Sequence, residues 1–530
     1  MKIYEAVSLT VLFLVGIALW TLPIQQDQLP FGEGDAAWHC SNGDWATKTD
    51  HVYWKLPFYI STWYYEYNKI IGVGSLEYPP PYHVGYSIFQ IIGGGRFVPV
   101  YILIAMSSFI GAFSVYLLLR KLYDFPTAIL ASSAMVFSFR EILVYLWGQR
   151  PTIFSFAFVP LVLYFLFRYL DSIYKENHKS IYLYLTSGML IFQFLIHPQG
   201  LMLSLTSIII YGIVQTIRKK KLPVGKFNLL HLAIILGISL LVIVPFFDIY
   251  RGANAGVETK IKIQDIHRLL DWMEIEDRQG YPNEMGGPPV IFYNTDKVYF
   301  PFYYILVVVG IIYLLLRRED QDILILSWLA GLYILLHFDV IGVFSFGRLS
   351  RMLMGETALF YSLISIGIVG GIKMFTEENL QKKIIPIAVI LLLIGVVSYN
   401  GLNAYQNLND AYKYPLRISN EQYEAAQWMD QNLPQSAYVY YAGVLTYPKQ
   451  RFFYILSHRP GIWQNDRADY PWMNVTHIVI DYSDAVKTNN GNLKGALTNY
   501  EQQFISAGVP LEYNHNNIKI YSIKGGKIAG

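Results

Sequence analysis

The chain has 530 residues, of which 54% are hydrophobic and only 15% are charged, and its mean hydropathy is +0.32. Soluble domains carry about 25% charged residues, so this composition excludes an ordinary soluble protein and indicates that much of the chain lies in lipid. The net charge of +3 gives no global field for binding nucleic acid, and the single cysteine, Cys40, excludes an intramolecular disulfide framework.

Apolar runs that approach the length needed to cross a bilayer, about 20 residues, occur along the first 400 residues. The first run begins with one lysine and is followed by no small-residue cleavage site, so it is predicted to be an uncleaved anchor. The third run is short and is expected to extend to Arg140. The eleven runs cover residues 4–24, 97–119, 125–138, 151–170, 180–196, 199–217, 228–247, 299–316, 322–338, 352–372 and 384–399.

Lysine and arginine are distributed unevenly between the loops. Most of these cations lie on alternate short loops, on the same side as Lys2, whereas the opposite short loops hold only Arg140, Arg150, Arg348 and Arg351. The positive-inside rule therefore places the N-terminus in the cytoplasm, and eleven spans place the C-terminus on the other side. We expect a multi-pass protein of the plasma membrane whose C-terminal tail is extracytoplasmic.

Three segments are too polar to span a membrane and fall on the outer face. The tail is predicted to be an α/β unit, with helices over 421–432 and 493–506, strands over 437–441 and 477–482, and two strands within 511–521. The fold class is thus an α-helical polytopic membrane protein with about 11 transmembrane helices and a small C-terminal extracytoplasmic α/β domain. The expected domains are 1–400, with outer loops 25–96 and 248–298, and 401–530.

The most informative outer segment follows the first span and reads GEGDAAWH from Gly32 to His39. A carboxylate such as Asp35, held at a membrane surface of low dielectric, tends to have a raised pKa that suits a general base. His39 lies four residues later and would share a helical face with Asp35. The alternative is that Asp35 caps a helix that begins at Ala36, and both roles can hold together.

Arginines on the outer side are the candidate phosphate ligands. Arg348 and Arg351 lie where the positive-inside rule disfavours cations, and the forked guanidinium is well suited to phosphate oxygens. Arg150 is a third candidate. Ion pairs with outer acids such as Asp339 or Glu356, or snorkelling to the interface, are the alternatives.

Three further candidate substrate-binding residues lie in a turn or just before a span. His197 lies in a tight His-Pro-Gln-Gly turn, where it could bind a phosphate oxygen or cap a helix. His83 closes a segment of three prolines that is expected to form a rigid, extended lead into the second span. Tyr78 opens that segment and could line a sugar site or anchor the chain in the interface.

In span order and loop lengths, the chain resembles the GT-C glycosyltransferases over nearly its whole length. The resemblance is carried by the anchor, the Gly-Asp-x-x-x-His segment at 34–39, the long outer loop, and the Tyr-Pro-Pro-x-Tyr-His segment at 78–83. Further similarity lies at 120–123, 148–151 and 425–429. This superfamily transfers sugars from polyprenyl-phosphate carriers and includes protein mannosyltransferases and the catalytic subunit of oligosaccharyltransferase.

The resemblance implies that Asp35 deprotonates or orients the acceptor. It also implies a polyprenyl-phosphate sugar as donor, a lipid, glycan or protein as acceptor, and contact with membrane lipid. The loop at 139–145 has Glu141 as its only carboxylate and lacks an Asp-x-Asp pair, which disfavours a divalent Mg or Mn ion, so no metal ligand is assigned. The absence of a Trp-Trp-Asp signature in the tail argues against transfer to asparagine.

Two other functions compete with glycosyl transfer. A transporter would bury charges within its spans and pair broken helices in two halves, whereas these spans are nearly free of ionisable residues at their centres. A non-catalytic membrane scaffold would tolerate the loss of Asp35. We therefore expect a membrane glycosyltransferase that acts at the extracytoplasmic face.

Overall fold

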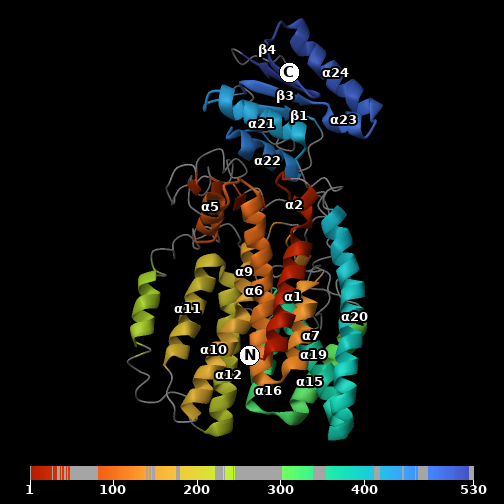
Figure 1. Ribbon diagram of the computed structural model, residues 1–530. Coiled ribbons are helices and arrows are strands. Elements are labelled where there is room, and N and C mark those ends of the chain that lie inside the picture. Colours follow the sequence, from red (N-terminus) through yellow and green to blue (C-terminus); the bar gives the residue numbers. More distant parts are fainter. Residues whose placement is uncertain are drawn as a thin grey trace.

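The protein folds as a long helical bundle with an α/β unit at one end, as the computed structural model shows (Figure 1). All structural statements below concern the residues that this structure describes. These are 2–26, 28–32, 36, 39–40, 43–44, 46–47, 81–138, 141–142, 145, 148, 150–174, 180–220, 231, 233–242, 244, 301–337, 352, 354–410, 418–443, 447–459, 461–462 and 475–523.

A helix overlaps each of the eleven apolar runs. In chain order these are α1 (Ile3–Trp20), α6 (Val98–Leu122), α7 (Phe125–Val136), α9 (Arg150–Ala157) with α10 (Val159–Tyr174), α11 (Ile181–Ile196), α12 (Pro198–Lys219), the helix Ala233–Val242, α15 (Pro301–Arg317), α16 (Asp320–Leu336), α19 (Glu356–Phe375) and α20 (Glu378–Asp410). Within the described residues, six helical stretches are long and apolar enough to cross a membrane: α1, α6, α9 with α10, α12, α19 and α20. The number of eleven spans stays a prediction.

Small residues allow helices of the bundle to pack with their backbones close together. A Cβ atom added to Gly310 of α15 would lie 2.3 Å from the carbonyl oxygen of Leu363, and one added to Gly367 of α19 would lie 2.6 Å from that of Leu306. Packing of this kind replaces the hydrophobic effect as the force that holds helices together in lipid. The contact between α15 and α19 therefore depends on these two glycines.

Ion pairs join the helix ends at the end of the bundle opposite the α/β unit (Figure 1). Arg120 pairs with Glu5 at 2.8 Å, and Lys219 pairs with Asp320 at 2.6 Å. Three other pairs join Lys121 to Asp171, Arg317 to Asp322, and Lys373 to Asp124. All five cations belong to the loops that the sequence assigns to the cytoplasm, so the predicted inner loops share one end of the molecule.

The α/β unit follows α20 and contains a five-stranded sheet in the order β2-β1-β3-β5-β4. Strand β1 is parallel to β2 and β3, and β5 is antiparallel to β3 and β4. The elements are α21 (Asn420–Asn432), β1 (Val439–Ala442), α22 (Tyr447–Ser457), β2 (Gly461–Ile462), β3 (His477–Asp481), α23 (Ser483–Lys487), α24 (Gly491–Ser506), β4 (Leu511–His515) and β5 (Ile518–Ser522).

Two features near the tail differ from the sequence-based expectation. Helix α20 continues to Asp410, ten residues beyond the end expected for the membrane domain. Helix α22 was not expected, because its aromatic and β-branched run Phe452–Ile455 also suits a strand. Buried residues of α21 and α22 belong to the same hydrophobic cluster as the bundle helices, so the tail packs directly onto the bundle.

Candidate functional site

Helix α5 (Pro81–Gly93) precedes α6 and corrects the extended lead that the prolines suggested (Figure 1). Proline fits the first turn of a helix, where its missing N–H has no intrahelical partner, so Pro81 begins α5 without interrupting it. The helix buries one face, made of Tyr82, His83, Tyr86, Ser87 and Gln90. This polar and aromatic face forms the centre of the candidate site.

The chain between His39 and Thr47, here called the first outer segment, packs along this face of α5. His39 Nδ1 lies 2.9 Å from His83 Nε2, and eight residues later Thr47 Oγ1 donates to Gln90 Oε1 at 2.6 Å. Between these two contacts, Gly43 packs closely against α5, because a Cβ atom on Gly43 would lie 2.5 Å from the Cβ atom of Tyr86. Residues 39, 43 and 47 recur at helical spacing, so two helical faces run side by side in the same direction.

The two histidines form a buried, hydrogen-bonded pair. Both side chains are buried, and the two rings stack. Burial lowers the pKa of His83 to about 3, so its imidazole is uncharged at neutral pH. In the His39–His83 hydrogen bond one ring therefore donates and the other accepts, which fixes the two side chains relative to each other.

Arg150, the first residue of α9, is 1% exposed and lies beside the same segment. Its Nη2 donates to the carbonyl oxygen of Phe31 at 3.1 Å, and its Nη1 donates to Tyr86 Oη at 3.4 Å and to Cys40 Sγ at 3.7 Å. Its guanidinium lies 4.9 Å from the ring centroid of Tyr101. None of the partners that the structure describes for it is a carboxylate, so carbonyl, hydroxyl and ring groups compensate the buried charge.

This guanidinium thus bridges the two ends of the segment that contains Asp35. The N-terminal end is held a second time, since the Phe31 N–H donates to Tyr101 Oη at 2.8 Å and the Tyr101 hydroxyl donates back to the Phe31 oxygen at 2.9 Å. The two rings also stack, with centroids 4.4 Å apart. The segment Phe31–Cys40 is therefore fixed at both ends by buried contacts.

Gly148 fixes the middle of the same segment. Its φ of +93° lies in a region that other residues rarely adopt, and a Cβ atom there would lie 2.3 Å from the backbone nitrogen of Ala36. Only glycine allows the turn before Arg150 to approach the residue that follows Asp35 so closely. The Gly-Gln-Arg-Pro motif at 148–151 therefore supports the Asp35 segment.

The cluster around Arg150 carries one formal charge among its described residues. Burial raises the pKa of the Cys40 thiol, and it raises the pKa of Tyr86 to about 12, so both are neutral at pH 7. With His83 also neutral, the positive charge of Arg150 is the charge that these residues present to the Asp35 segment. A buried cation of this kind favours the ionised form of a nearby carboxylate.

A second polar cluster lies at the other end of the α5 face. Arg96 Nε donates to both oxygens of the Asp44 carboxylate, at 3.0 and 2.8 Å, and Gln90 Nε2 donates to Asp44 at 3.3 Å. Burial lowers the pKa of Arg96 and the Asp44 carboxylate raises it, with a net shift upward. A pocket of about 290 Å³ opens here, lined by Asp44, Thr47, Gln90, Gly94, Gly95 and Arg96.

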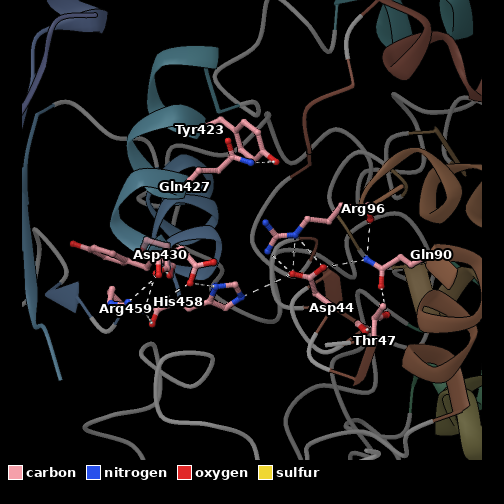
Figure 2. Close-up of polar contacts among 12 residues, drawn as sticks. Asp44, Thr47, Gln90, Arg96, Tyr423, Gln427, Asp430, His458 and Arg459 are labelled. Atoms are coloured by element: carbon pink, nitrogen blue, oxygen red, sulfur yellow. Dashed lines mark hydrogen bonds and ion pairs between the residues drawn. The ribbon is translucent and has the colours of Figure 1, made fainter. Parts of the chain in front are cut away.

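Helices α21 and α22 of the tail face this second cluster (Figure 2). His458, just after α22, lies with Nδ1 2.8 Å from Asp430 Oδ1 and with Nε2 4.0 Å from Asp44 Oδ2. The ring of Phe97 lies edge-on to that of Tyr423, with centroids 6.1 Å apart. His458 of the tail thus lies next to Asp44, which is one of the residues that line the pocket.

His197 adopts the capping role that its turn suggested. Its Nδ1 accepts from the Gln199 N–H at 3.4 Å at the start of α12, and its carbonyl oxygen accepts from Ser155 Oγ at 2.7 Å. Gly200 packs against the same serine, since a Cβ atom there would lie 2.2 Å from Ser155 Oγ. His197 therefore joins α12 to α9, the helix that Arg150 begins.

The structure places four of the eight candidate site residues. It brings His39, His83 and Arg150 together around α5 and places His197 on the other side of α9. Asp35, Tyr78, Arg348 and Arg351 lie outside the described residues.

The sequence reasoning missed Asp44 and Arg96. The signal for Arg96 was available, because it is a cation on the predicted outer side and thus runs against the positive-inside bias, as Arg348 does. Asp44 lies nine residues after Asp35 in an expected outer loop, with no motif that singles it out.

The part of the chain that the structure describes contains no group of three His, Cys, Asp or Glu side chains that could hold a metal ion.

Residues 2–355 match the model of a family described as a family of unknown function (DUF6541). No curated relative matches the sequence. Because the match covers well over half of the chain, it establishes membership of the family.

Several solved structures share the fold at low sequence identity. The oligosaccharyltransferase of Archaeoglobus fulgidus in its apo form has a TM-score of 0.60 and 14% identity, over 91% of this chain and 70% of that chain. ArnT from Cupriavidus metallidurans bound to undecaprenyl phosphate has a TM-score of 0.55 and 11% identity, over 97% of both chains. The mycobacterial arabinofuranosyltransferase AftD has a TM-score of 0.52 and 12% identity, over 89% of this chain and 35% of that chain.

All three relatives are GT-C glycosyltransferases, which confirms the resemblance seen in the sequence. Proteins of this fold are multi-pass membrane proteins, and the long apolar helices of the bundle agree with that. The chain therefore has the GT-C fold and belongs to the DUF6541 family, a family of unknown function.

Proposed function

We propose that the protein is a membrane glycosyltransferase that transfers a sugar from a polyprenyl-phosphate-linked donor to a lipid, glycan or protein acceptor at the extracytoplasmic face. The observation that carries the proposal is the frame around the Asp35 segment, in which Arg150 bridges both ends and Gly148 supports the middle. A rigid frame of this kind holds a reacting group in a fixed geometry, which is how a general base becomes effective.

In the proposed reaction the Asp35 carboxylate accepts the proton of an acceptor hydroxyl. The hydroxyl oxygen forms a bond to the anomeric carbon of the donor sugar, and the bond between that carbon and the phosphate oxygen breaks. The polyprenyl phosphate leaves with the electron pair of the broken bond. Arg348 and Arg351 are proposed to stabilise the phosphate charge, and Tyr78 is proposed to contact the sugar.

Arg150 has a different role in this proposal from the phosphate ligand that the sequence suggested. It is buried, and its described donors serve Phe31, Tyr86 and Cys40, so it is assigned as a positioning residue for the Asp35 segment. His39 and His83 support the same segment from α5 through their mutual hydrogen bond.

The donor class is supported by what proteins of this fold bind. The ArnT structure holds undecaprenyl phosphate, and a structure of the oligosaccharyltransferase AglB from Archaeoglobus fulgidus holds an inhibitory peptide and a dolichol-phosphate. Both lipids are polyprenyl-type phosphates. A lipid-phosphate carrier therefore agrees with the fold and with the apolar bundle below the site.

The test uses purified full-length protein in proteoliposomes. Lipids that copurify are identified by mass spectrometry, and a panel of radiolabelled polyprenyl-phosphate sugars is then supplied with acceptor lipid extract. Asp35→Asn is expected to lower sugar transfer at least about 100-fold, the usual contribution of a general base. Glu378→Gln, at an exposed position at the start of α20, is the control and should keep full activity.

Undiminished transfer by Asp35→Asn would remove this residue from the mechanism. If no sugar of the panel is transferred but labelled lipid crosses the bilayer, the protein is a transporter and the proposal fails. A chelator added to the wild-type reaction tests the metal question separately, since the mechanism above predicts no loss of rate.

A further inference from the structure

The pocket beside Asp44 and Arg96 has no assigned role in the reaction proposed above. It lies on the same face of α5 as the Arg150 cluster, beyond Gln90 and about two helical turns from His83. Thr47 connects it to that face, since its hydroxyl contacts both Ser87 Oγ at 3.0 Å and Gln90 Oε1 at 2.6 Å. The pocket therefore lies along the helix that positions the candidate catalytic segment.

The wall of the pocket carries both charges but has no net charge. The Asp44 carboxylate and the Arg96 guanidinium neutralise each other through a two-point contact (Figure 2). An amide from Gln90 and a hydroxyl from Thr47 add further donors and acceptors. A phosphate would meet the Asp44 carboxylate and a cation would meet the Arg96 guanidinium, so the wall favours a neutral ligand rich in hydroxyl groups.

Size and shape agree with one small ligand. The volume of about 290 Å³ lies at the lower end of the range for small-molecule sites, roughly 300–1,000 Å³. The turn at Gly94–Gly95 forms one wall without side chains, and a Cβ atom on Gly94 would meet nothing within 4 Å. The floor is polar and the turn leaves the space open, which fits a single sugar ring.

Two residues of the tail lie next to residues that line the pocket (Figure 2). His458 Nε2 lies 4.0 Å from Asp44 Oδ2, and Tyr423 of α21 contributes to the raised pKa of Arg96. The charged pair of the pocket is therefore in contact with the tail.

We infer that this pocket binds one neutral sugar unit, whose hydroxyl groups accept hydrogen bonds from Arg96 and exchange hydrogen bonds with Asp44, Gln90 and Thr47. The inference rests on the proposed function for its purpose, namely to hold a glycosyl group near the Asp35 segment. The same chemistry is offered by a free glycan and by a lipid-linked sugar, so both sources are tested.

Binding is measured without turnover, by saturation-transfer NMR of methyl mannoside, glucoside and galactoside with the full-length protein in detergent. Gly95→Leu adds a bulky side chain to the lining of the pocket, at a position where its Cβ atom would lie 3.4 Å from Pro99 Cδ, and Thr47→Val removes one hydroxyl. We expect at least one glycoside to bind the wild type, tenfold weaker binding in Gly95→Leu, and several-fold weaker binding in Thr47→Val. Gly188→Leu, at an open position on α11, should leave binding unchanged, and thermal unfolding verifies that each variant is folded.

The outcomes separate this inference from the proposed function. Asp35→Asn should bind the glycoside as the wild type does even if it transfers no sugar. Competition by a polyprenyl-phosphate sugar supports a lipid-linked source, and its absence supports a free glycan. The inference is overturned if no glycoside binds, if Gly95→Leu binds as tightly as the wild type, or if inorganic phosphate displaces the bound glycoside.

Discussion

Arg150 is a buried cation on the predicted outer side, and its described partners are uncharged groups of the protein. The positive-inside rule singled it out as a cation on the outer side, and phosphate was the natural ligand to expect there. The structure buries it instead among Phe31, Cys40, Tyr86 and Tyr101. A positioning role and a phosphate-binding role make different kinetic predictions.

Arg150→Lys keeps the charge but loses the fork that reaches Phe31 and Cys40 together, so the Asp35 segment loses the contact that bridges its two ends. We expect kcat for sugar transfer to fall at least about tenfold, with little change in KM for the donor. A phosphate ligand would show the opposite pattern, a raised KM for the donor. Steady-state kinetics in proteoliposomes distinguish the two, with Arg168→Lys on α10, whose guanidinium donates to the Tyr182 hydroxyl, as the control.

At the scale of elements, the length of the apolar runs predicted the bundle helices, whereas the polar residues and their positions predicted the site only in part. An apolar run must bury its backbone in a helix wherever it lies in lipid, so α6, α12 and α19 follow directly from composition. The three prolines predict an extended lead into the second span, whereas the last of them, Pro81, begins helix α5. Its buried face could not be predicted, because it depends on contacts with the first outer segment, 40 or more residues earlier.

The contact between α15 and α19 gives a prediction at this scale. Gly367→Val places a side chain within 2.6 Å of the Leu306 carbonyl oxygen and forces the two helices apart. We expect a loss of about 1–3 kcal/mol in the free energy of unfolding, typical of an overpacked contact, seen as a lower thermal midpoint in detergent. The matched variant Gly395→Val, on α20 where a Cβ atom meets nothing within 4 Å, should unfold near the wild-type temperature; equal midpoints for the two would contradict the packing argument.

For the whole molecule, the charge pattern and the tail define two opposite ends. The five cations paired at one end of the bundle come from the loops predicted to be cytoplasmic, and the α/β unit lies at the other end (Figure 1). The sequence predicted this grouping because lysine and arginine are concentrated on alternate loops along the chain. It could not predict that the tail would share a hydrophobic cluster with the bundle, since that depends on how α21 and α22 pack.

The predicted orientation can be tested with the chain's single cysteine replaced. In a Cys40→Ser background, Asn492→Cys on α24 and Glu378→Cys at the start of α20 each introduce one thiol, at opposite ends of the molecule. A membrane-impermeant maleimide is expected to label the first variant in intact cells and the second only after permeabilisation. The reverse pattern would show that the chain is inserted the other way round.

The length of α20 has a geometric consequence for the reaction. Its 33 residues, at a rise of 1.5 Å each, span about 50 Å, whereas the hydrocarbon core of a bilayer is about 30 Å thick. The helix is thus about 20 Å longer than the hydrocarbon core, and this excess is shared between its two ends, because the expected apolar run covers residues 384–399. In the reaction proposed above, the headgroup of a carrier lipid and the hydroxyl of an acceptor would meet in the layer between the lipid boundary and the α/β unit.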